Sequence, residues 1–319
     1  MTMTPFDRIE LGRKAKELGF VRDTFEKVCR LVDVLSFMEQ DEHLRDSLAL
    51  KGGTAINLTI FELPRLSVDI DLDYSRDLPR ADMLNDRSVL TDHVKKHMAA
   101  NGYVLSDRSK QYHALDSFVF AYPNSGGVQD NIKIEINYML RSHILEPNRC
   151  IVHLPWLEQE LTVLRVDPVE IFASKIVALL NRSTPRDLYD LNNLLASDLL
   201  HSMDPSLLRK CVVFYMAIGS DFVLQDPDFD GIRHITQNRI KADLVPVLRS
   251  GVFFDVQKAQ NVCIPYLRDL LTLSEDERLF LSAFQEKRYC PELLFESREI
   301  LERIGNHPMA LWKCSERDR

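Results

Sequence analysis

The sequence lacks several features that define other classes of protein. Its six cysteines form no CxxC pair, which excludes a zinc ribbon and argues against a disulfide framework. Its nine histidines include no HxH pair. No run of 18 apolar residues occurs, so we expect no membrane-spanning helix and no membrane partner. With only 11 glycines and 14 prolines, long flexible linkers are not expected either.

The chain also lacks an excess of positive charge. Its formal net charge is −8, which excludes a surface that is basic throughout but permits a local basic cleft. Residues 1–10 contain acidic side chains and no apolar segment, so we expect no secretory signal there. Because the cysteines are expected to be reduced, we predict a cytoplasmic protein.

What is present is an ordinary globular composition arranged in two parts. The 319 residues are 45% hydrophobic, enough for a full core and two domains. Strand and turn signals dominate up to residue 165, and helix starts follow at Asp167-Pro168, at Thr184-Pro185 and at the capping box Ser274-x-x-Glu277. We therefore predict an α+β fold. Residues 1–165 are expected to form a mixed β-sheet core flanked by helices, with a helical N-terminal arm, and residues 166–319 a helical C-terminal domain. The predicted strands before residue 165 are 48–51, 65–74, 103–110, 116–122 and 131–139.

The most informative segment is the alternating run VDIDLD. Residues two apart on a strand point to the same face, so Asp69 and Asp71 project together while Ile70 and Leu72 face the core. Neighbouring carboxylates repel each other unless a positive charge lies between them. A hard divalent cation supplies that charge, and Mg²⁺ prefers carboxylate and phosphate oxygens. We therefore predict a Mg²⁺ site at Asp69 and Asp71, with Mn²⁺ as an alternative ion.

A glycine turn precedes the acidic strand by about 15 residues. Gly52 and Gly53 follow a predicted strand and open a helical stretch, where the backbone approaches a phosphate closely and the helix start favours anions. Thr54 adds a hydroxyl donor. Ser67 shares the face of Asp69, and contact with a phosphate or a role in ending a turn are equally good interpretations. These four residues are candidates for nucleotide binding.

A site with two metal ions requires a third carboxylate. In the run NIKIEINYM, Lys133 and Glu135 lie on one face and Ile134 on the other, so Glu135 is the candidate. The competing interpretation for Asp69, Asp71 and Glu135 is a solvated strand face with no ligand.

Two further segments carry charged residues in unusual places. Lys175 projects from the apolar stripe of a predicted helix at 168–181, which favours contact with a triphosphate, although its ammonium can also extend to the edge of the helix. In the next helix Asp190 is a candidate for orienting Lys175 or the acceptor. Arg182 or Arg186 is a candidate phosphate ligand, but Arg186 and Asp190 also have the spacing of a simple i,i+4 ion pair. Arg65 is a further candidate for nucleotide binding and adds to the expected basic surface.

Taken together, these motifs resemble those of the AbiEii/AbiGii-type toxin nucleotidyltransferases, or DUF1814 proteins, in the DNA-polymerase-β-like superfamily. The matching stretches are KGGTAINL, RLSVDIDLDY, KIEINY and the segment from Lys175 to Asp190, and they cover about residues 50–195. Many relatives have Gly-Ser where this chain has Gly53-Thr54. The resemblance implies a nucleotidyltransferase core in which Asp69, Asp71, Lys175 and Asp190 occupy catalytic motif positions.

The resemblance also implies a reaction and partners. We expect transfer of a nucleoside monophosphate from an NTP to an acceptor, with release of pyrophosphate. The favoured acceptor is the 3′ end of tRNA, and the protein would be the toxin of a toxin–antitoxin or phage-exclusion system with a cognate antitoxin. Transfer to a protein hydroxyl, a catalytically inactive nucleotide-binding protein, and a hydrolase with an acidic metal site are the alternatives.

Overall fold

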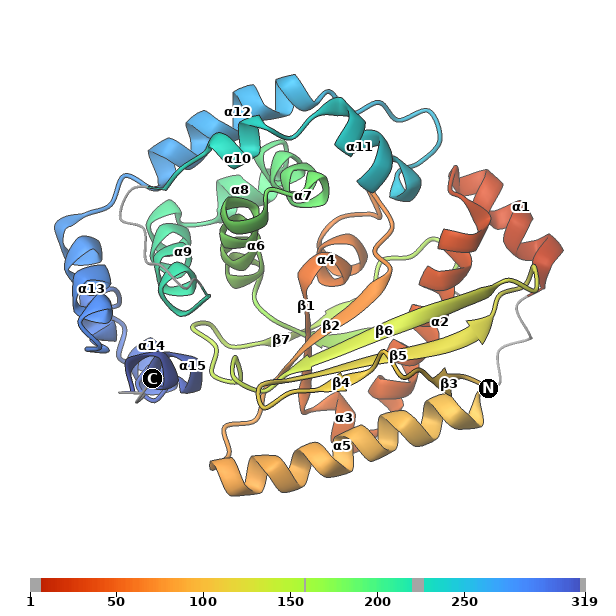
Figure 1. Cartoon of the computed structure of the whole chain (residues 1–319), viewed down its shortest axis with the longest axis horizontal. Coiled ribbons are helices and arrows are strands. Elements are labelled where there is room, and N and C mark those ends of the chain that lie inside the picture. Colours follow the sequence, from red (N-terminus) through yellow and green to blue (C-terminus); the bar gives the residue numbers. More distant parts are fainter. Residues whose placement is uncertain (1–6, 158, 220–226, 316–319) are drawn as a thin grey trace. The chain divides into compact units, whose positions relative to one another are not determined.

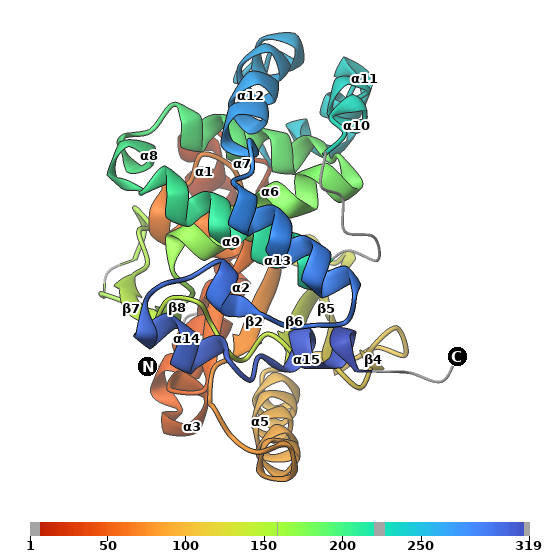
Figure 2. The same ribbon diagram turned by 90° about the vertical axis from the view of Figure 1, so that its left-hand side faces the viewer.

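A computed structural model describes residues 7–157, 159–219 and 227–315 of the chain (Figure 1, Figure 2). These residues form two compact units, which we describe separately. The first unit comprises the described residues of Met1–Arg141, Pro147–Arg165 and Pro246–Val252. The second unit comprises those of Ser142–Glu146, Val166–Val245 and Phe253–Arg319. Sheet and helices together confirm the expected α+β class. Among the described residues, none of the helices has the length and apolar character needed to cross a membrane.

The first unit is built on a mixed sheet of eight strands. Its order is β3-β5-β6-β2-β1-β8-β7, and β4 pairs with β5 beside β3. The pairs β2–β6 and β1–β8 are parallel, and the other pairs are antiparallel. The strands are β1 (Leu48–Lys51), β2 (Asp69–Tyr74), β3 (Val104–Leu105), β4 (Lys110–Gln111), β5 (Leu115–Pro123), β6 (Gln129–Asn137), β7 (Asn148–Ile151) and β8 (Thr162–Arg165).

One face of this sheet is apolar and covered by helices. The helices and turns of the first unit are α1 (Arg8–Leu18), α2 (Arg22–Gln40), α3 (Glu42–Arg45), α4 (Gly52–Ala55), a π-helical turn (Ile56–Ile60) and α5 (Arg80–Ala100). Leu35 of α2 lies near Leu50 and Leu72 of the sheet. On α5, the ammonium of Lys95 lies 4.8 Å from the ring centre of Phe118. Because α2 and α5 cover the face that carries Leu72 and Phe118, the alternate residues of β2 and β6 point to the opposite face.

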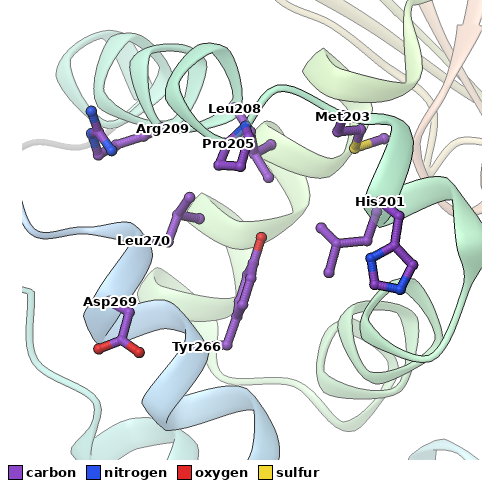
Figure 3. A pocket seen from close by; sticks show the side chains of 9 residues that line it. His201, Met203, Pro205, Leu208, Arg209, Tyr266, Asp269 and Leu270 are labelled. Carbon is purple, nitrogen blue, oxygen red and sulfur yellow. The ribbon is translucent and has the colours of Figure 1, made fainter.

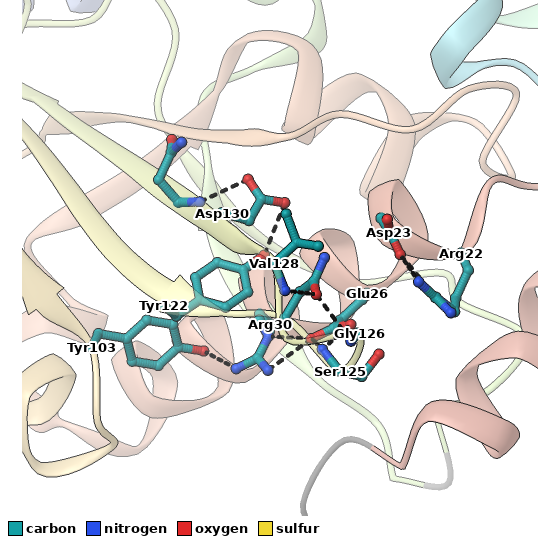
Figure 4. A network of polar contacts seen from close by, with 12 residues as sticks. Arg22, Asp23, Glu26, Arg30, Tyr103, Tyr122, Ser125, Gly126, Val128 and Asp130 are labelled. Atoms are coloured by element: carbon teal, nitrogen blue, oxygen red, sulfur yellow. Dashed lines mark hydrogen bonds and ion pairs between the residues drawn. The ribbon is translucent and has the colours of Figure 1, made fainter.

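A buried polar network fixes α2 against the hairpin formed by β5 and β6 (Figure 4). The carboxylate of Glu26, which is fully buried, accepts backbone N–H bonds from Ser125 in the hairpin turn at 2.9 and 3.0 Å. Arg30 donates to the same carboxylate at 2.8 Å, and its guanidinium lies 4.2 Å from the ring centre of Tyr122. Lys27 adds an ion pair with Asp130 at 2.8 Å. The network therefore sets the position of β6, which carries Glu135.

The second unit is helical within the described residues. Its helices and 3₁₀ turn are α6 (Pro168–Arg182), α7 (Pro185–Leu195), α8 (Asp198–Ser202), α9 (Pro205–Gly219), α10 (Asp230–Arg233), α11 (Gln237–Asp243), α12 (Val256–Leu270), α13 (Glu275–Gln285), the 3₁₀ turn Pro291–Leu293, α14 (Arg298–Ile304) and α15 (Pro308–Cys314). A further 3₁₀ turn, Val245–Val247, crosses from one unit to the other. The helix starts predicted from the sequence are confirmed at Asp167, Thr184 and Ser274, whose side chains accept backbone N–H bonds as N-caps.

A five-residue segment, Ser142–Glu146, joins this helical unit through a buried carboxylate. Glu170 of α6 accepts backbone N–H bonds from Ile144 at 3.1 Å and Leu145 at 2.7 Å, and an O–H bond from Tyr215 at 2.6 Å. Burial raises the pKa of Glu170 to about 7, although the three hydrogen bonds act in the opposite direction.

Candidate active site

The two predicted metal ligands lie on the sheet face that α2 and α5 leave uncovered. Asp69 and Asp71 are half-buried residues of β2, two positions apart, whereas Ile70 between them is fully buried. Because β2 and β6 are parallel, Asp69 is opposite Lys133 and Asp71 is opposite Glu135. Paired residues of adjacent strands point to the same face, so the three predicted carboxylates share one face of β2 and β6. The two strands are neighbours in the sheet (Figure 1).

A lysine lies among these acids. Lys133 Nζ is 2.8 Å from Glu135 Oε2 in an ion pair. Burial alone would lower the pKa of Lys133. The hydrogen bond and charge of Glu135, together with the charges of Asp69 and Asp71, outweigh burial and raise that pKa. Lys133 therefore stays charged and offsets part of the repulsion among the carboxylates.

The glycine turn packs directly against the acidic strand. Gly52 has φ +66°, in the left-handed region that favours glycine, and a Cβ added to it would come within 2.5 Å of Asp71 Oδ2. A Cβ on Gly53 would come within 2.9 Å of Arg65 Nη2 and 3.0 Å of Ser67 Oγ. Both glycines are therefore needed for close approach, and the turn brings Gly52 and Asp71 together.

Thr54 connects the start of α4 to the start of β2. Its side chain is fully buried. Its hydroxyl donates to the carbonyl oxygen of Asp69 and accepts a hydrogen bond from the hydroxyl of Ser67, with 3.0 Å between the two hydroxyl oxygens. The hydroxyl was expected to bind a phosphate. In this structure it instead holds the backbone of Asp69, while Ser67 lies beside the glycine turn, before β2 begins.

The guanidinium of Arg65 lies under the glycine turn. The residue is only 2% exposed, and its Nη1 donates to the carbonyl of Leu66 at 3.0 Å. Its backbone forms an isolated bridge with Leu248. Arg65 thus packs against Gly53 as a buried residue, whereas the sequence predicts it on a basic surface.

Lys51 and Asp73 form a second charged pair beside Asp71. Lys51 is opposite Asp71 in the β1–β2 register, and its ammonium lies 2.5 Å from Asp73 Oδ1. Burial raises the pKa of Asp73, while the charge of Lys51 acts in the opposite direction. Sequence reasoning missed Lys51, although its position directly before Gly52 was a usable signal.

In the second unit, the two predicted catalytic residues contact each other. Lys175 Nζ, buried on α6, lies 3.2 Å from Asp190 Oδ2 and 2.9 Å from Asp187 Oδ1 on α7. Asp187 also accepts from Arg182 Nε at 2.7 Å and from Thr184 Oγ1 at 2.7 Å. Burial alone would raise the pKa of Asp187, but Lys175, Arg182 and Thr184 hold it well below its usual range. Asp187 is therefore the centre of this network.

The other predicted residue of this region has a different contact. Arg186 Nε donates to the carbonyl of Asp243, the last residue of α11, at 2.9 Å.

The donor chemistry of the acidic face fits a hard divalent cation in part. Asp69 and Asp71 supply oxygen ligands from adjacent positions of one face, as Mg²⁺ prefers. Over residues 7–157, 159–219 and 227–315, however, no three His, Cys, Asp or Glu side chains are grouped as a metal site. Glu135 is engaged by Lys133 instead. His93 and His97, four apart on α5, contact Asp41 and the ring of Phe37 respectively.

A separate pocket of about 490 Å³ lies among α8, α9 and α12 of the second unit (Figure 3). Its walls are mainly apolar, with the ring of Tyr266 at its centre (Figure 3). It contains none of the predicted site residues. The pocket is lined by Leu200, His201, Met203, Pro205, Leu208, Arg209, Tyr266, Asp269 and Leu270.

Comparison with known proteins adds independent findings to this geometry. Residues 36–257 match the family described as "Nucleotidyl transferase AbiEii toxin, Type IV TA system". The fold is similar to that of MenT4, a nucleotidyltransferase toxin from Mycobacterium tuberculosis H37Rv, with a TM-score of 0.66 and 16% sequence identity. The alignment covers 94% of this chain and 98% of that one. No curated protein matches the sequence significantly.

Proposed function

The chain belongs to the AbiEii nucleotidyltransferase toxin family of type IV toxin–antitoxin systems, and from this premise we propose that it transfers a nucleoside monophosphate from an NTP to the 3′ end of an RNA, with tRNA as the favoured acceptor. An acceptor hydroxyl forms a bond to the α-phosphorus, and the bond from that phosphorus to the bridging oxygen of pyrophosphate breaks. A cognate antitoxin belongs to this biological context.

The observation that carries the proposal is the close approach of the glycine turn to Asp71 on the acidic strand β2. Gly52 packs against the side chain of Asp71, and Asp71 is opposite Glu135 in the register. We assign Asp69 and Asp71 as ligands of Mg²⁺, or of Mn²⁺ in its place, with Glu135 as the third ligand. When bound, such an ion would neutralise phosphate charge and activate the attacking oxygen.

The nucleotide is assigned to the glycine turn. Gly52 and Gly53 let a phosphate approach the backbone, and the N–H groups at the start of α4 favour negative charge. Ser67 and Arg65 line the Gly53 position. In this proposal Thr54 acts through its bond to the Asp69 carbonyl, so it positions a metal ligand.

We assign roles to Lys175, Asp190 and Arg186 from the positions that they occupy in the family motifs. Lys175 and Arg186 would offset charge on the triphosphate, and Asp190 would orient Lys175, to which it is paired at 3.2 Å. Most of the rate enhancement would come from positioning and from electrostatic stabilisation of the transferring phosphoryl group.

The acceptor and the nucleotide are tested together. The protein is incubated separately with each of the four α-labelled NTPs, Mg²⁺ or Mn²⁺, and either total RNA or total cell protein. We expect label on RNA of tRNA size, sensitive to ribonuclease and resistant to protease. Label on protein alone would replace the RNA acceptor with a protein hydroxyl. No product with any NTP and either acceptor would contradict nucleotide transfer.

A further inference from the structure

The acidic face contains its own cation. Lys133 is opposite Asp69 in the β2–β6 register, and the next residue on the same face of β6 is Glu135, which is opposite Asp71. Three acids and one lysine therefore occupy two successive register pairs on one face of β2 and β6: Asp69 with Lys133, and Asp71 with Glu135. Because like charges destabilise each other at this spacing, Lys133 offsets part of the repulsion among the three carboxylates.

The lysine is attached to one particular acid. Its ammonium lies 2.8 Å from Glu135 Oε2, and the two side chains are 36% and 26% exposed. Ion pairs with this much exposure are weak and can open at little cost. Lys133 holds Glu135, and within the described parts of the chain no three His, Cys, Asp or Glu side chains are grouped as a metal site.

We propose that Lys133 is a built-in counter-ion that holds Glu135 while the divalent-cation site is empty and releases it when a cation binds. The inference rests on the proposed metal site of Asp69 and Asp71. Lys133 then competes with the cation for Glu135, so the resting protein is protected from charge repulsion at the expense of metal affinity.

The test measures Mn²⁺ binding, by the electron paramagnetic resonance signal of free Mn²⁺, and thermal unfolding with and without Mn²⁺. Lys133→Met keeps the length of the side chain and removes its charge. We expect Mn²⁺ to bind on the order of five-fold more tightly. We also expect the unfolding temperature without metal to fall and its rise on adding Mn²⁺ to increase.

Two controls separate release of Glu135 from a general change in charge. Lys110 of β4 is opposite Ser117 of β5, which is opposite Glu135 of β6, so Lys110 is separated from Glu135 by one strand. Lys110→Met should leave Mn²⁺ affinity almost unchanged. In a Glu135→Gln background, Lys133→Met should give no gain in affinity. If the gain persists there, or is absent from the single variant, Lys133 does not control Glu135.

Failure of this inference is distinguishable from failure of the proposed function. Binding of Mn²⁺ to the unaltered protein that is lost in Asp69→Asn, without any effect of Lys133→Met, would overturn only the role of Lys133. Absence of any Asp69-dependent Mn²⁺ binding would overturn the metal site and this inference together.

Discussion

Gly52 lies so close to Asp71 that a single added carbon would come within 2.5 Å of the carboxylate oxygen Oδ2. The backbone of Gly52 is also at φ +66°, so a side chain there is strained as well as obstructed. The glycine turn and the acidic strand therefore pack directly against each other. Asp71 can keep its position only if residue 52 is glycine.

Replacing this glycine should damage activity more than stability. We expect Gly52→Ala to lower the free energy of unfolding by about 1–3 kcal/mol and to reduce nucleotide transfer further, because Asp71 must move. Gly102→Ala is the matched control, since Gly102 has φ +80° with no atom within 4 Å of an added Cβ. Equal losses of activity in the two variants would refute a specific contact with Asp71.

The hydroxyl of Thr54 gives a second prediction. Thr54→Val removes the bond to the Asp69 carbonyl and keeps the shape of the side chain, so unfolding should become easier by about 1 kcal/mol. Thr54→Ser keeps the hydroxyl and should transfer nucleotide with nearly the original KM for NTP. A large rise of that KM in Thr54→Val, with stability unchanged, would instead favour direct contact of the hydroxyl with phosphate.

Asp187 is expected to be a stabilising centre of the second unit. Asp187→Asn leaves Lys175 buried with one carboxylate partner fewer, and we expect a loss of about 3 kcal/mol in urea unfolding. Arg182→Gln removes a partner that is 60% exposed and should cost under about 1 kcal/mol. A loss in Asp187→Asn no larger than that in Arg182→Gln would argue against a buried network around Lys175.

Glu170 predicts how stability depends on pH. Its pKa in the folded protein is raised to about 7 from 4.5, so the unfolded chain releases this proton at lower pH than the folded protein does. The contribution of Glu170 to stability is therefore complete below pH 4.5 and is lost as pH rises through 7, by up to about 3 kcal/mol.

Glu170→Gln should flatten this part of the stability curve, measured by urea unfolding from pH 4.5 to 8. The exposed Glu299→Gln is the control and should leave the curve unchanged. If Glu170→Gln keeps the full fall in stability between pH 4.5 and 7, another group is responsible for it.

Local patterns predicted much of the fold because they act over few residues. Alternation along β6 and the N-caps at Asp167 and Ser274 were readable from the chain alone. The acidic strand was predicted from residue 65 but begins at Asp69, because the backbone N–H of Leu66 donates to the carbonyl of Val247 outside the sheet. Strands β7 and β8 were missed because neither of their sequences, NRCI and TVLR, alternates between apolar and polar residues or forms a continuous apolar run.

The candidate site was predictable where spacing determines geometry and less so where distant residues meet. The common face of Asp69 and Asp71 follows from the two-residue period of a strand. The pairings of Lys51 with Asp73 and of Lys175 with Asp187 depend on strand register and helix packing, which no local pattern reveals. The burial of Arg65 is a tertiary effect of the same kind.

The central claim is that Asp69 and Asp71 carry out nucleotide transfer, and the most direct test is the initial rate of α-labelled NMP incorporation into RNA. Asp69→Asn and Asp71→Asn are compared with Asp92→Asn, which removes an exposed carboxylate of α5, after confirming equal unfolding temperatures. We predict at least about a 100-fold loss of rate in the first two variants and none in the third. Full activity in folded Asp69→Asn would contradict the account.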